Sequence, residues 1–537
     1  MIRINEIKQS LDCGKEELFA ACAKALKIKV SQICDITIVR RSVDSRKKND
    51  VHFVYSVDVE VLGNEEKIIK KSGSKNVSQS ESYHYEMPEN RRTSSLRPVI
   101  VGFGPAGIFA ALTLSRAGLR PLVLERGADV ETRTKDISRF FETRVLDENS
   151  NVQFGEGGAG TFSDGKLTTG IKSNLCRKVF LEFFDHGAPE EILWSGTPHI
   201  GTDKLALVIK KMREEIISLG GEVLFGARLT DLIVYNASVQ GVTYEKDGES
   251  FDFETDTVIL AVGHSARDTV KMLQKKGVTM IQKPFSVGAR IEHPREFIDR
   301  SQYGSFAGHP ALSAAVYKLA CHGEHERGAY TFCMCPGGTV INATSEKNGV
   351  VTNGMSEFAR DKENSNSAIL VNVYPEDFPS QDPLAGFELQ KTLEHRAFEL
   401  GGGDYTAPCQ LVGDFLNDRP SKKLSFVKPS FTTGVTPSDI RKVLPKKVTD
   451  TMAQALVQMD KKLSGFALPD AVLTAPESRS SSPVRILRDD IFQANIRGLY
   501  PCGEGAGYAG GIVSAAVDGL RSAHAVLLDE SELNHRT

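Results

Sequence analysis

Tryptophan, cysteine and long apolar runs are all scarce in this chain of 537 residues. With a single tryptophan, Trp194, no aromatic-rich binding face is suggested, and the nine cysteines are few for the length and odd in number. Because no apolar leader opens the chain, we expect these cysteines to be reduced thiols of a cytoplasmic protein. Three glycines and a proline interrupt the most apolar stretch, residues 99–114, so no membrane span is expected.

An excess of charge of one sign is lacking as well. Lysine and arginine total 66 and aspartate and glutamate 69, which gives a formal net charge of −3. A chain of this kind does not attract nucleic acid as a whole, which leaves only a local patch as a nucleic-acid site. The basic cluster within residues 40–48 contains Asp44 and no interleaved aromatic residue, and this favours a solvated loop.

The rest of the composition is that of a globular protein, with 40% hydrophobic and 25% charged residues. At about 100–200 residues per domain, the length allows two to four domains. Alternating apolar residues over 51–59 mark a strand of a first small unit, and a stretch rich in Lys, Ser, Glu and Asn follows. We predict a small α+β domain over residues 1–62, a linker over 63–96, the first part of a nucleotide-binding domain over 97–284, a substrate lobe over 285–475 and the rest of the nucleotide-binding domain over 476–537.

The strongest motif lies in residues 97–127, RPVIVGFGPAGIFAALTLSRAGLRPLVLERG. A short strand at 99–101 leads into the spacing G-x-G-x-x-G, a helix over 106–116 and a second strand at 122–124 that ends in an acid. The first glycine permits the tight turn, the second lets the backbone approach a pyrophosphate, and the third lets helix and strand pack closely. The helix N-terminus and the acid complete a dinucleotide site, for which we predict Gly102, Gly104, Pro105, Ala106, Gly107, Glu125 and Arg126.

The same glycine spacing occurs twice more without the rest of the unit. Gly155, Gly157 and Gly160 are followed by TFSDGKL instead of an apolar helix pattern. The match that begins at Gly505 lies too close to Thr537 for a second strand and its acid. Neither match is a complete nucleotide-binding unit, so we expect no separate nicotinamide domain.

The segment 498–520, GLYPCGEGAGYAGGIVSAAVDGL, resembles FAD-dependent oxidoreductases of the glutathione-reductase type. In those proteins a late G-[DE] places its carboxylate on the ribityl chain, and the next helix aims its N-terminus at the pyrimidine end of the flavin. The segment 257–264, TVILAVGH, resembles the strand near the adenosine half. The resemblance implies Gly263, Gly503, Glu504, Gly511 and Ile512 as cofactor-binding residues.

Further segments resemble bacterial proteins known as uncharacterised FAD-dependent dehydrogenases. They are NVQFGEGGAGTFSDGKL (151–167), PHIGTDKL (198–205), PFSVGARIEHP (284–294), FCMCPGG (332–338), TNGMSEFAR (352–360) and PESRSSSPVRI (476–486). The resemblance implies bound FAD and an α/β fold, with a three-layer Rossmann-type FAD-binding domain, an inserted mixed α+β substrate lobe and a small N-terminal α+β domain. It supplies no substrate, and NAD(P)H stays open as a transient electron donor.

Glycines and one lysine after the first nucleotide unit are further candidates for the cofactor site. Gly157 and Gly158 would allow a close approach of backbone N–H groups to the pyrophosphate or the flavin edge. Lys166 is a candidate to reach the flavin N5 or a substrate anion. A capped surface turn is the alternative for this segment, because S-D-G is common turn chemistry.

Four residues of the substrate lobe are candidates for catalysis. Cys333 and Cys335 form C-x-C, where a thiolate near a flavin could relay electrons or form an adduct; buried packing thiols are the alternative. Arg290 is a candidate to hold a substrate carboxylate, and His293 is a candidate to move a proton. The alternative is that both residues belong to a polar strand face or an ion pair. Arg479 and Arg485 flank SSSPV as a candidate phosphate or substrate clamp.

These patterns predict an FAD-dependent oxidoreductase that transfers hydride between a bound flavin and an unidentified small molecule, with an electron donor or acceptor as its other partner. No Ser-His-Asp arrangement or metal-ligand spacing is found, so hydrolase and metal chemistry are not expected. Two alternatives stay open: a flavoprotein that binds or acts on RNA through its N-terminal domain, and a non-catalytic scaffold that keeps FAD as a structural element.

Overall fold

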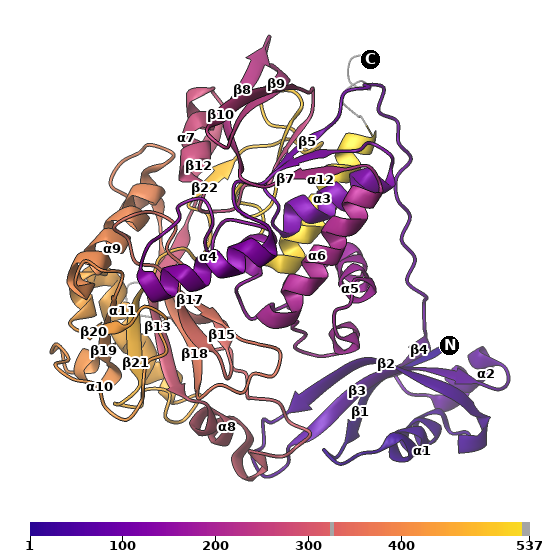
Figure 1. Cartoon of the computed structure of the whole chain (residues 1–537). Coiled ribbons are helices and arrows are strands. Elements are labelled where there is room, and N and C mark those ends of the chain that lie inside the picture. Colours follow the sequence, from indigo (N-terminus) through magenta and orange to yellow (C-terminus); the bar gives the residue numbers. More distant parts are fainter. Residues whose placement is uncertain (323–326, 529–537) are drawn as a thin grey trace.

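The structure, a computed structural model, describes residues 1–322 and 327–528. The segments 323–326 and 529–537, which belong to the predicted ranges 285–475 and 476–537, lie outside this part. Figure 1 shows three bodies: an N-terminal unit at the lower right, a lobe of strands and helices at the left, and layers of helices and strands at the upper right. Within the described ranges, no helix has the length and apolarity that a bilayer crossing requires.

The N-terminal unit is a four-stranded antiparallel sheet with two helices, in the strand order β2-β3-β1-β4. This β-α-β-β-α-β arrangement is the ferredoxin-like supersecondary unit. Its apolar strand residues are buried, and Ile2, Ile4 and Val57 are at most 2% exposed. The elements are β1 (Ile2–Gln9), α1 (Lys15–Leu26), β2 (Ile33–Asp44), β3 (His52–Val61), α2 (Glu65–Ser72) and β4 (Val77–Gln79).

The predicted linker over residues 63–96 is corrected, because its first part completes the N-terminal unit. Asn64 caps α2 by accepting a hydrogen bond from the Lys67 backbone, and β4 pairs with β1 through Val77 and Ile4. The polar composition of this stretch reflects a short helix in which only Ile68 and Ser72 are buried, while Glu65 and Ile69 are half-buried and the others are exposed. A helix that covers a small sheet needs few apolar residues, so the helix could not be recognised from composition alone.

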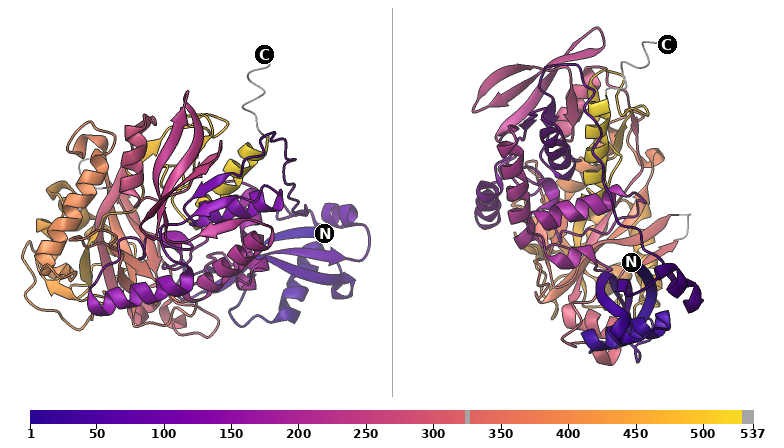
Figure 2. Two further views of the ribbon diagram at one scale, coloured as in Figure 1. Left: turned by 45° about the horizontal axis from the view of Figure 1, so that its top comes forward. Right: turned by 90° about the vertical axis from the view of Figure 1, so that its right-hand side faces the viewer.

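An extended arm, residues 80–96, connects this unit to the rest of the chain. It runs along α12 (Ile512–Leu528), where the Arg91 N–H donates to the Leu527 carbonyl over 2.8 Å. The Tyr85 hydroxyl lies 2.9 Å from the His524 ring. Both views in Figure 2 show the N-terminal unit projecting from the body, with the arm returning to the last helix.

A five-stranded parallel sheet forms the centre of the nucleotide-binding part, in the order β23-β11-β5-β6-β7. Its middle residues, such as Ile100 and Val123, face the helices, whereas Val99 and Leu124 face a three-stranded antiparallel sheet. The strands are β5 (Val99–Val101), β6 (Leu122–Leu124), β7 (Glu222–Leu224), β11 (Val258–Leu260) and β23 (Leu499–Pro501). The helices are α3 (Pro105–Arg116), α5 (Leu175–Asp185), α6 (Thr202–Ser218) and α12. The third layer is β8 (Ala227–Tyr235), β9 (Ser238–Lys246) and β10 (Glu249–Glu254), with α7 (Arg267–Lys275) beside it.

The substrate lobe contains a seven-stranded mixed sheet in the order β14-β15-β18-β13-β21-β19-β20. The strands are β13 (Phe285–Pro294), β14 (Ala320–His322), β15 (Gly328–Cys335), β18 (Asn364–Val373), β19 (Ala407–Leu411), β20 (Val435–Pro437) and β21 (Val472–Glu477). The hairpin β16 (Thr339–Asn342) and β17 (Thr352–Met355) lies beside it, and β12 (Met280–Gln282) pairs with β22 (Val484–Ile486). The helices are α8 (Arg295–Tyr303), α9 (Ala385–Gly401), α10 (Val412–Leu416) and α11 (Lys446–Asp460).

This architecture confirms the predicted α/β fold with its three-layer parallel-sheet domain and mixed lobe. Because the strands of the central sheet are parallel, the turns after β5, β6, β11 and β23 all leave its carboxyl edge. Ligands of open α/β sheets bind at that edge. The fold therefore brings three segments near residues 100, 260 and 504 to one place, although 400 residues separate the first from the last.

Candidate functional site

A cavity of about 710 Å³ lies where the nucleotide-binding layers meet the substrate lobe. Its volume is typical of small-molecule and cofactor sites. One wall consists of the turns after β5, β6, β11 and β23, and another of β15, β17 and β21. Fourteen of the predicted cofactor and catalytic residues line it: Gly102, Gly104, Pro105, Ala106, Glu125, Arg126, Gly158, Lys166, Gly263, Cys333, Gly503, Glu504, Gly511 and Ile512.

The three glycines of the first turn serve different purposes. Gly102 has φ +96°, and a Cβ there would lie 2.4 Å from the Ala261 carbonyl oxygen. A Cβ on Gly107 would lie 2.0 Å from the Gly102 carbonyl oxygen, so Gly107 allows helix and strand to meet but does not face the cavity. Gly104 differs, because a Cβ there would contact only Gly158, at 3.7 Å. The second glycine is therefore not required by protein packing and leaves room in the cavity.

Glu125 closes this turn from the end of β6. The carboxylate is 4% exposed and accepts hydrogen bonds from the backbone N–H groups of Phe103 (2.8 Å), Gly127 (2.9 Å) and Gly155 (2.9 Å). Three of about four lone-pair directions are thus occupied, and one is left for a ligand. Glu125 organises both glycine turns as well as lining the cavity.

Arg133 holds the second glycine loop, and sequence reasoning missed it. This fully buried guanidinium on α4 (Val130–Thr143) donates to four backbone carbonyls, those of Asn151, Val152, Glu156 and Gly158, over 2.7–3.0 Å. Desolvation lowers the pKa of Arg133 to about 10. A signal was present, because Val130, Arg133, Ile137 and Phe140 form the buried face of one helix. An arginine on an apolar face predicts buried acceptors.

The second glycine loop contributes one predicted residue and not the other. A Cβ on Gly158 would lie 3.0 Å from the Gly104 Cα, so the two loops touch at the cavity wall. Gly157 instead faces Thr161, whose Oγ1 would lie 1.9 Å from a Cβ, and it does not line the cavity. The prediction that Gly157 approaches the cofactor is wrong, because its φ of +81° serves the turn itself.

The C-terminal segment supplies the other end of the cavity. Gly503 has φ +73°, and its N–H donates to Asp518 over 2.7 Å. Glu504 Oε2 lies 3.7 Å from His264 Nδ1, and the buried Nε2 of His264 has no hydrogen-bond partner in the part of the chain that the structure describes. His264 and Asp518 were not predicted; His264 follows Gly263 directly, and that position was the available signal.

Two helices begin at the same cavity. Gly104 and Pro105 line it at the start of α3, and Gly511 and Ile512 line it at the start of α12. Each N-terminus carries free N–H groups and a partial positive charge, which favours anions. The site therefore has two separate anion-favouring positions within one elongated space.

Lys166 reaches the boundary between the two walls. Its Nζ is buried without a hydrogen-bond partner and lies 3.6 Å from Asp164. Asp164 is already held by Arg360, whose Nε donates to it over 3.0 Å. Burial opposes ionisation of Asp164, but the charges of Lys166 and Arg360 keep its pKa below the ordinary value. An ammonium in this position requires an acceptor from a ligand or solvent in the cavity.

Arg290 does not reach the cavity, so the predicted substrate clamp is wrong. Its guanidinium is fully buried and forms a two-point pair with Glu477, with Nε and Nη2 at 3.0 and 2.5 Å. Nη1 donates to the Cys333 carbonyl and to Asn366. The alternative of an internal ion pair holds, because a guanidinium with these partners has no donor to offer a substrate.

His293 and Cys335 also lie away from the cavity. His293 is fully buried, with Nε2 2.8 Å from the Phe466 carbonyl oxygen, and desolvation lowers its pKa to about 4. A neutral, enclosed imidazole cannot exchange protons with a ligand, so this prediction is wrong. Cys335 lies behind Cys333 at the end of β15, whereas Cys333 faces the cavity.

Of the predicted arginine clamp, only Arg479 borders the cavity. Its guanidinium is bound by Glu394 over 2.9 and 2.8 Å and donates to Ser265 and Ser345. Arg267 pairs with the same Glu394, so the three side chains tie α7 and α9 to the segment after β21. Arg485 donates to the Gly507 carbonyl and does not line the cavity. These arginines join the lobes and do not form a clamp.

Comparison with known sequences decides the family. A protein from Clostridium beijerinckii, described as uncharacterised, is 46% identical over 529 residues, which is 98% of this chain and 98% of that protein. Residues 284–480 match a family model for the C-terminal domain of FAD-dependent proteins, and residues 1–60 match a domain of unknown function. The chain belongs to the FAD-dependent protein family.

Two solved structures match this FAD-dependent protein over most of its length, with low identity and low TM-scores. A flavin-dependent brominase is 11% identical with a TM-score of 0.37, over 81% of this chain and 79% of that one. A glycerol-3-phosphate dehydrogenase from Bacillus halodurans, complexed with FAD, is 12% identical with a TM-score of 0.37, over 82% of this chain and 65% of that one. Scores this low carry no argument about chemistry.

The cavity of the FAD-dependent protein fits the cofactor that its family implies. Within the described residues, a Cβ on Gly104 would meet only the Gly158 Cα, at 3.7 Å, and two helix N-termini are available for phosphate and pyrimidine oxygens. The orphaned Nε2 of His264 and Nζ of Lys166 are buried donors or acceptors that lack a protein partner. Glu125 and Glu504 lie on the same cavity at separate turns. A long, polar, partly anionic molecule would satisfy all of these groups.

Proposed function

We propose that this protein is an FAD-dependent oxidoreductase that exchanges hydride with a small molecule bound between the nucleotide-binding layers and the substrate lobe. One observation carries the proposal: the turns suited to FAD and a wall of apolar and polar residues from the substrate lobe border a single cavity. A protein that kept FAD only as a structural element would need no such shared space beside it. The identity of the electron donor or acceptor is part of what the experiment below measures.

The residues that would hold FAD follow from the geometry of the turns. Glu125 would accept from the adenosine ribose with its remaining lone pair, and the N-terminus of α3 with Gly104 would hold the pyrophosphate. Glu504 would take the ribityl chain. The N-terminus of α12 would stabilise negative charge at the pyrimidine end. When bound, the flavin supplies the hydride chemistry.

The remaining cavity groups act on the substrate. Lys166, whose ammonium has no hydrogen-bond partner among the described residues, would orient an anionic group or donate a hydrogen bond near the cofactor. The wall of Phe332, Met334 and Val351 would exclude water from the reacting atoms. Asn353 lines the same wall and offers a neutral hydrogen-bonding group.

The RNA-binding alternative is not favoured by the basic cluster. Arg41 stacks against Phe53 and Trp194, with its guanidinium 4.8 and 4.5 Å from the ring centres. Arg46 pairs with Asp44, and the Lys48 ammonium donates to the Gln302 carbonyl. Three of the five cations of residues 40–48 are thus paired with groups of the protein, although Arg46 and Lys48 stay exposed, which reduces the free charge available to phosphates.

Anaerobic absorbance spectroscopy tests the proposal. The purified full-length chain should be yellow, and its flavin absorbance should bleach on addition of NADH, NADPH or a reducing metabolite and return with an oxidant. The control is free FAD under the same conditions. A chain that neither copurifies with FAD nor binds added FAD would contradict the proposal, and a flavin that no donor reduces would favour the structural scaffold.

A further inference from the structure

Cys333 occupies an unusual backbone position in the cavity wall. The pairing of β15 with β18 slips between Phe332 and Cys335, which is a β-bulge, and Cys333 has φ +42°. Residues other than glycine rarely adopt this left-handed backbone conformation. Bulges next to active sites re-aim a side chain, and here the half-buried thiol of Cys333 faces the cavity while Cys335 stays behind it.

Buried partners hold this conformation in place. Arg290 Nη1 donates to the Cys333 carbonyl over 3.0 Å. Glu477 fixes Arg290 through two contacts, and Thr352 donates to Glu477 over 3.0 Å. Strained residues persist only where the surroundings over-determine them, and they gather at functional sites. Arg290 is therefore a positioning residue for Cys333, although it cannot touch a ligand.

The charges around the thiol favour its ionised form. Lys166 and Arg290 are positive, Glu477 is negative, and Cys335 Sγ lies 3.3 Å from the Cys333 carbonyl oxygen. The Cys335 thiol donates to that carbonyl, whose second lone pair accepts from Arg290, and rotation of the S–H group would bring the Cys335 proton to the Cys333 sulfur instead. This hydrogen bond lowers the pKa of Cys333 to about 6; desolvation opposes it, and the charges of Lys166 and Arg290 assist it.

The orphaned ammonium of Lys166 is an independent observation at the same place. Its Nζ has no hydrogen-bond partner among the described residues, and its ion-pair partner Asp164, 3.6 Å away, is already bound by Arg360, so a negative charge in the cavity would satisfy the remaining donors. A thiolate at Cys333 would supply part of that charge. The remaining donors would attract an anionic or electron-rich group of an incoming molecule.

We propose that Cys333 is a nucleophilic thiol of this cavity, with Lys166 beside it and Cys335 as its proton-holding neighbour, and that it reacts with small soft electrophiles. The sulfur electron pair forms the new S–C bond, and the electrophile releases its leaving group with the bonding pair. The proposal rests on the proposed function only for the place where the substrate binds, because the thiol reaction needs no cofactor.

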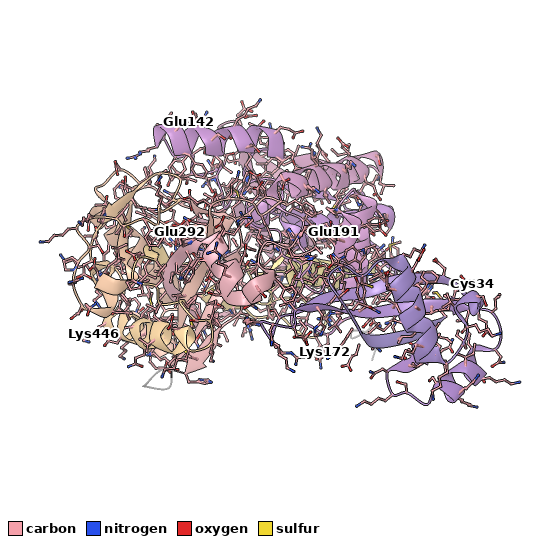
Figure 3. All side chains as sticks on the ribbon, turned by 90° about the horizontal axis from the view of Figure 1, so that it is seen from below. Cys34, Glu142, Lys172, Glu191, Glu292 and Lys446 are labelled. Atoms are coloured by element: carbon pink, nitrogen blue, oxygen red, sulfur yellow. The ribbon has the colours of Figure 1, made fainter. Side chains whose placement is uncertain are left out.

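Alkylation by iodoacetamide, followed by peptide mass spectrometry, tests this on the full-length chain. In that reaction the Cys333 sulfur displaces iodide. Cys34 serves as the internal control, because it is exposed and lies on the outer end of the N-terminal unit (Figure 3). The rate at Cys333 should rise with a midpoint near pH 6 and level off above pH 7. At pH 6.5 it should exceed that of Cys34 by about fivefold, since a lower pKa also reduces intrinsic nucleophilicity.

Two lysine variants show whether the site or the general fold sets this reactivity. Lys166→Met should move the midpoint of Cys333 upward, whereas Lys172→Met, an exposed lysine of the same loop that Figure 3 labels, should leave it unchanged. The wild-type pH profile needs no variant, so a misfolded Lys166→Met protein does not remove the test.

The outcomes separate this proposal from the proposed function. If Cys333 stays unmodified while Cys34 reacts, or reacts with a midpoint between pH 8 and 9, the proposal is wrong. A colourless chain that binds no FAD but has the low midpoint contradicts the flavin function and supports the nucleophilic thiol. A yellow, reducible chain whose Cys333 has an ordinary midpoint supports the flavin function and contradicts the nucleophilic thiol.

Discussion

The Glu125 carboxylate has a structural and a ligand-binding role. It accepts hydrogen bonds from three backbone N–H groups and leaves one lone pair for a ligand in the cavity. Its amide analogue keeps the size but offers fewer acceptors. Glu125→Gln should therefore leave buried N–H donors unpaired, at about 1–3 kcal/mol each. We expect a lower melting temperature and at least a tenfold weaker affinity for FAD.

Calorimetry and flavin fluorescence titration measure these two effects. Glu222→Gln is the matched control, because Glu222 is an exposed acid on β7 of the same sheet. Equal losses in both variants would show that the buried carboxylate has no special part in the site.

Glu156 makes stability depend on pH. Desolvation dominates its surroundings and raises its pKa from 4.5 to about 7, although Val130 N–H and Arg213 oppose this. The folded state therefore keeps a proton that the unfolded chain has lost, so stability is greatest below pH 4.5 and falls as pH rises toward 7. The loss amounts to at most about 3 kcal/mol for this group.

Urea unfolding at pH 5 and pH 8 isolates this contribution. The free energy of unfolding should fall between these values in the wild type by more than it does in Glu156→Gln, because glutamine cannot titrate. The same pH dependence in both proteins would mean that Glu156 is ionised in the folded state throughout.

At the scale of one element, two glycines at the start of α3 affect different properties: Gly104 affects ligand binding, and Gly107 affects packing. Gly104→Ala meets ordinary van der Waals contact in the protein, and the backbone there has φ −80°, so the fold should keep its stability. The methyl group would nevertheless occupy space beside the helix N-terminus. We expect FAD affinity to fall by about tenfold or more, with a change in melting temperature of the FAD-free chain of less than about 2 °C.

Gly107→Ala should show the reverse order of effects. Its Cβ would lie 2.0 Å from the Gly102 carbonyl oxygen, which forces helix and strand apart. Overpacking of this kind costs about 1–3 kcal/mol, so the melting temperature should drop before FAD is added. If Gly104→Ala destabilises the FAD-free chain as much as Gly107→Ala does, the cavity has no room at Gly104.

At the scale of the whole molecule, the cavity joins two bodies that are each stabilised by their own core. FAD should therefore protect segments of both walls from hydrogen exchange, namely α3 and α12 on one side and β15 and β17 on the other. At 1,000 times its Kd, FAD adds about 4 kcal/mol of stability.

Hydrogen-exchange mass spectrometry with and without FAD checks this. Peptides of β2 in the N-terminal unit are the internal control, since none of its residues lines the cavity. Protection confined to α3 would mean that the substrate lobe does not contact the bound cofactor. The wall that contains Cys333 would then not lie beside the flavin.

Local patterns in the sequence predict much of this protein, and the first nucleotide unit shows why. A turn, a helix cap and a strand end depend on neighbours within a few residues, so Gly102, Gly104 and Gly107 could be assigned before any tertiary contact was known. Gly503 and Glu504 were assigned by resemblance, and they line the same cavity. The family and the fold class rest on such local segments.

Side-chain environment could not be predicted in the same way. Arg290 and Cys333 lie between apolar residues in strands, and His293 follows Glu292 in one of them. Period two alone does not reveal whether such a polar side chain meets a cavity or a buried partner. Glu477, which lies 187 residues beyond Arg290, decided that case. Arg133 shows the opposite error, because its role required four carbonyls that only the folded loop brings together.

The amino-acid sequence by itself determined the turns, strands and helix of the first nucleotide unit, because backbone sterics and short-range hydrogen bonds set these features; it did not reveal α2 and β4 in the predicted linker. Only the tertiary structure decided which charged side chains are free to meet a ligand. That outcome depends on pairing between residues far apart in the chain. Glu477 and Glu394 form ion pairs with arginines that the sequence predicted to bind a substrate. Lys166 and Cys333, in contrast, line the cavity.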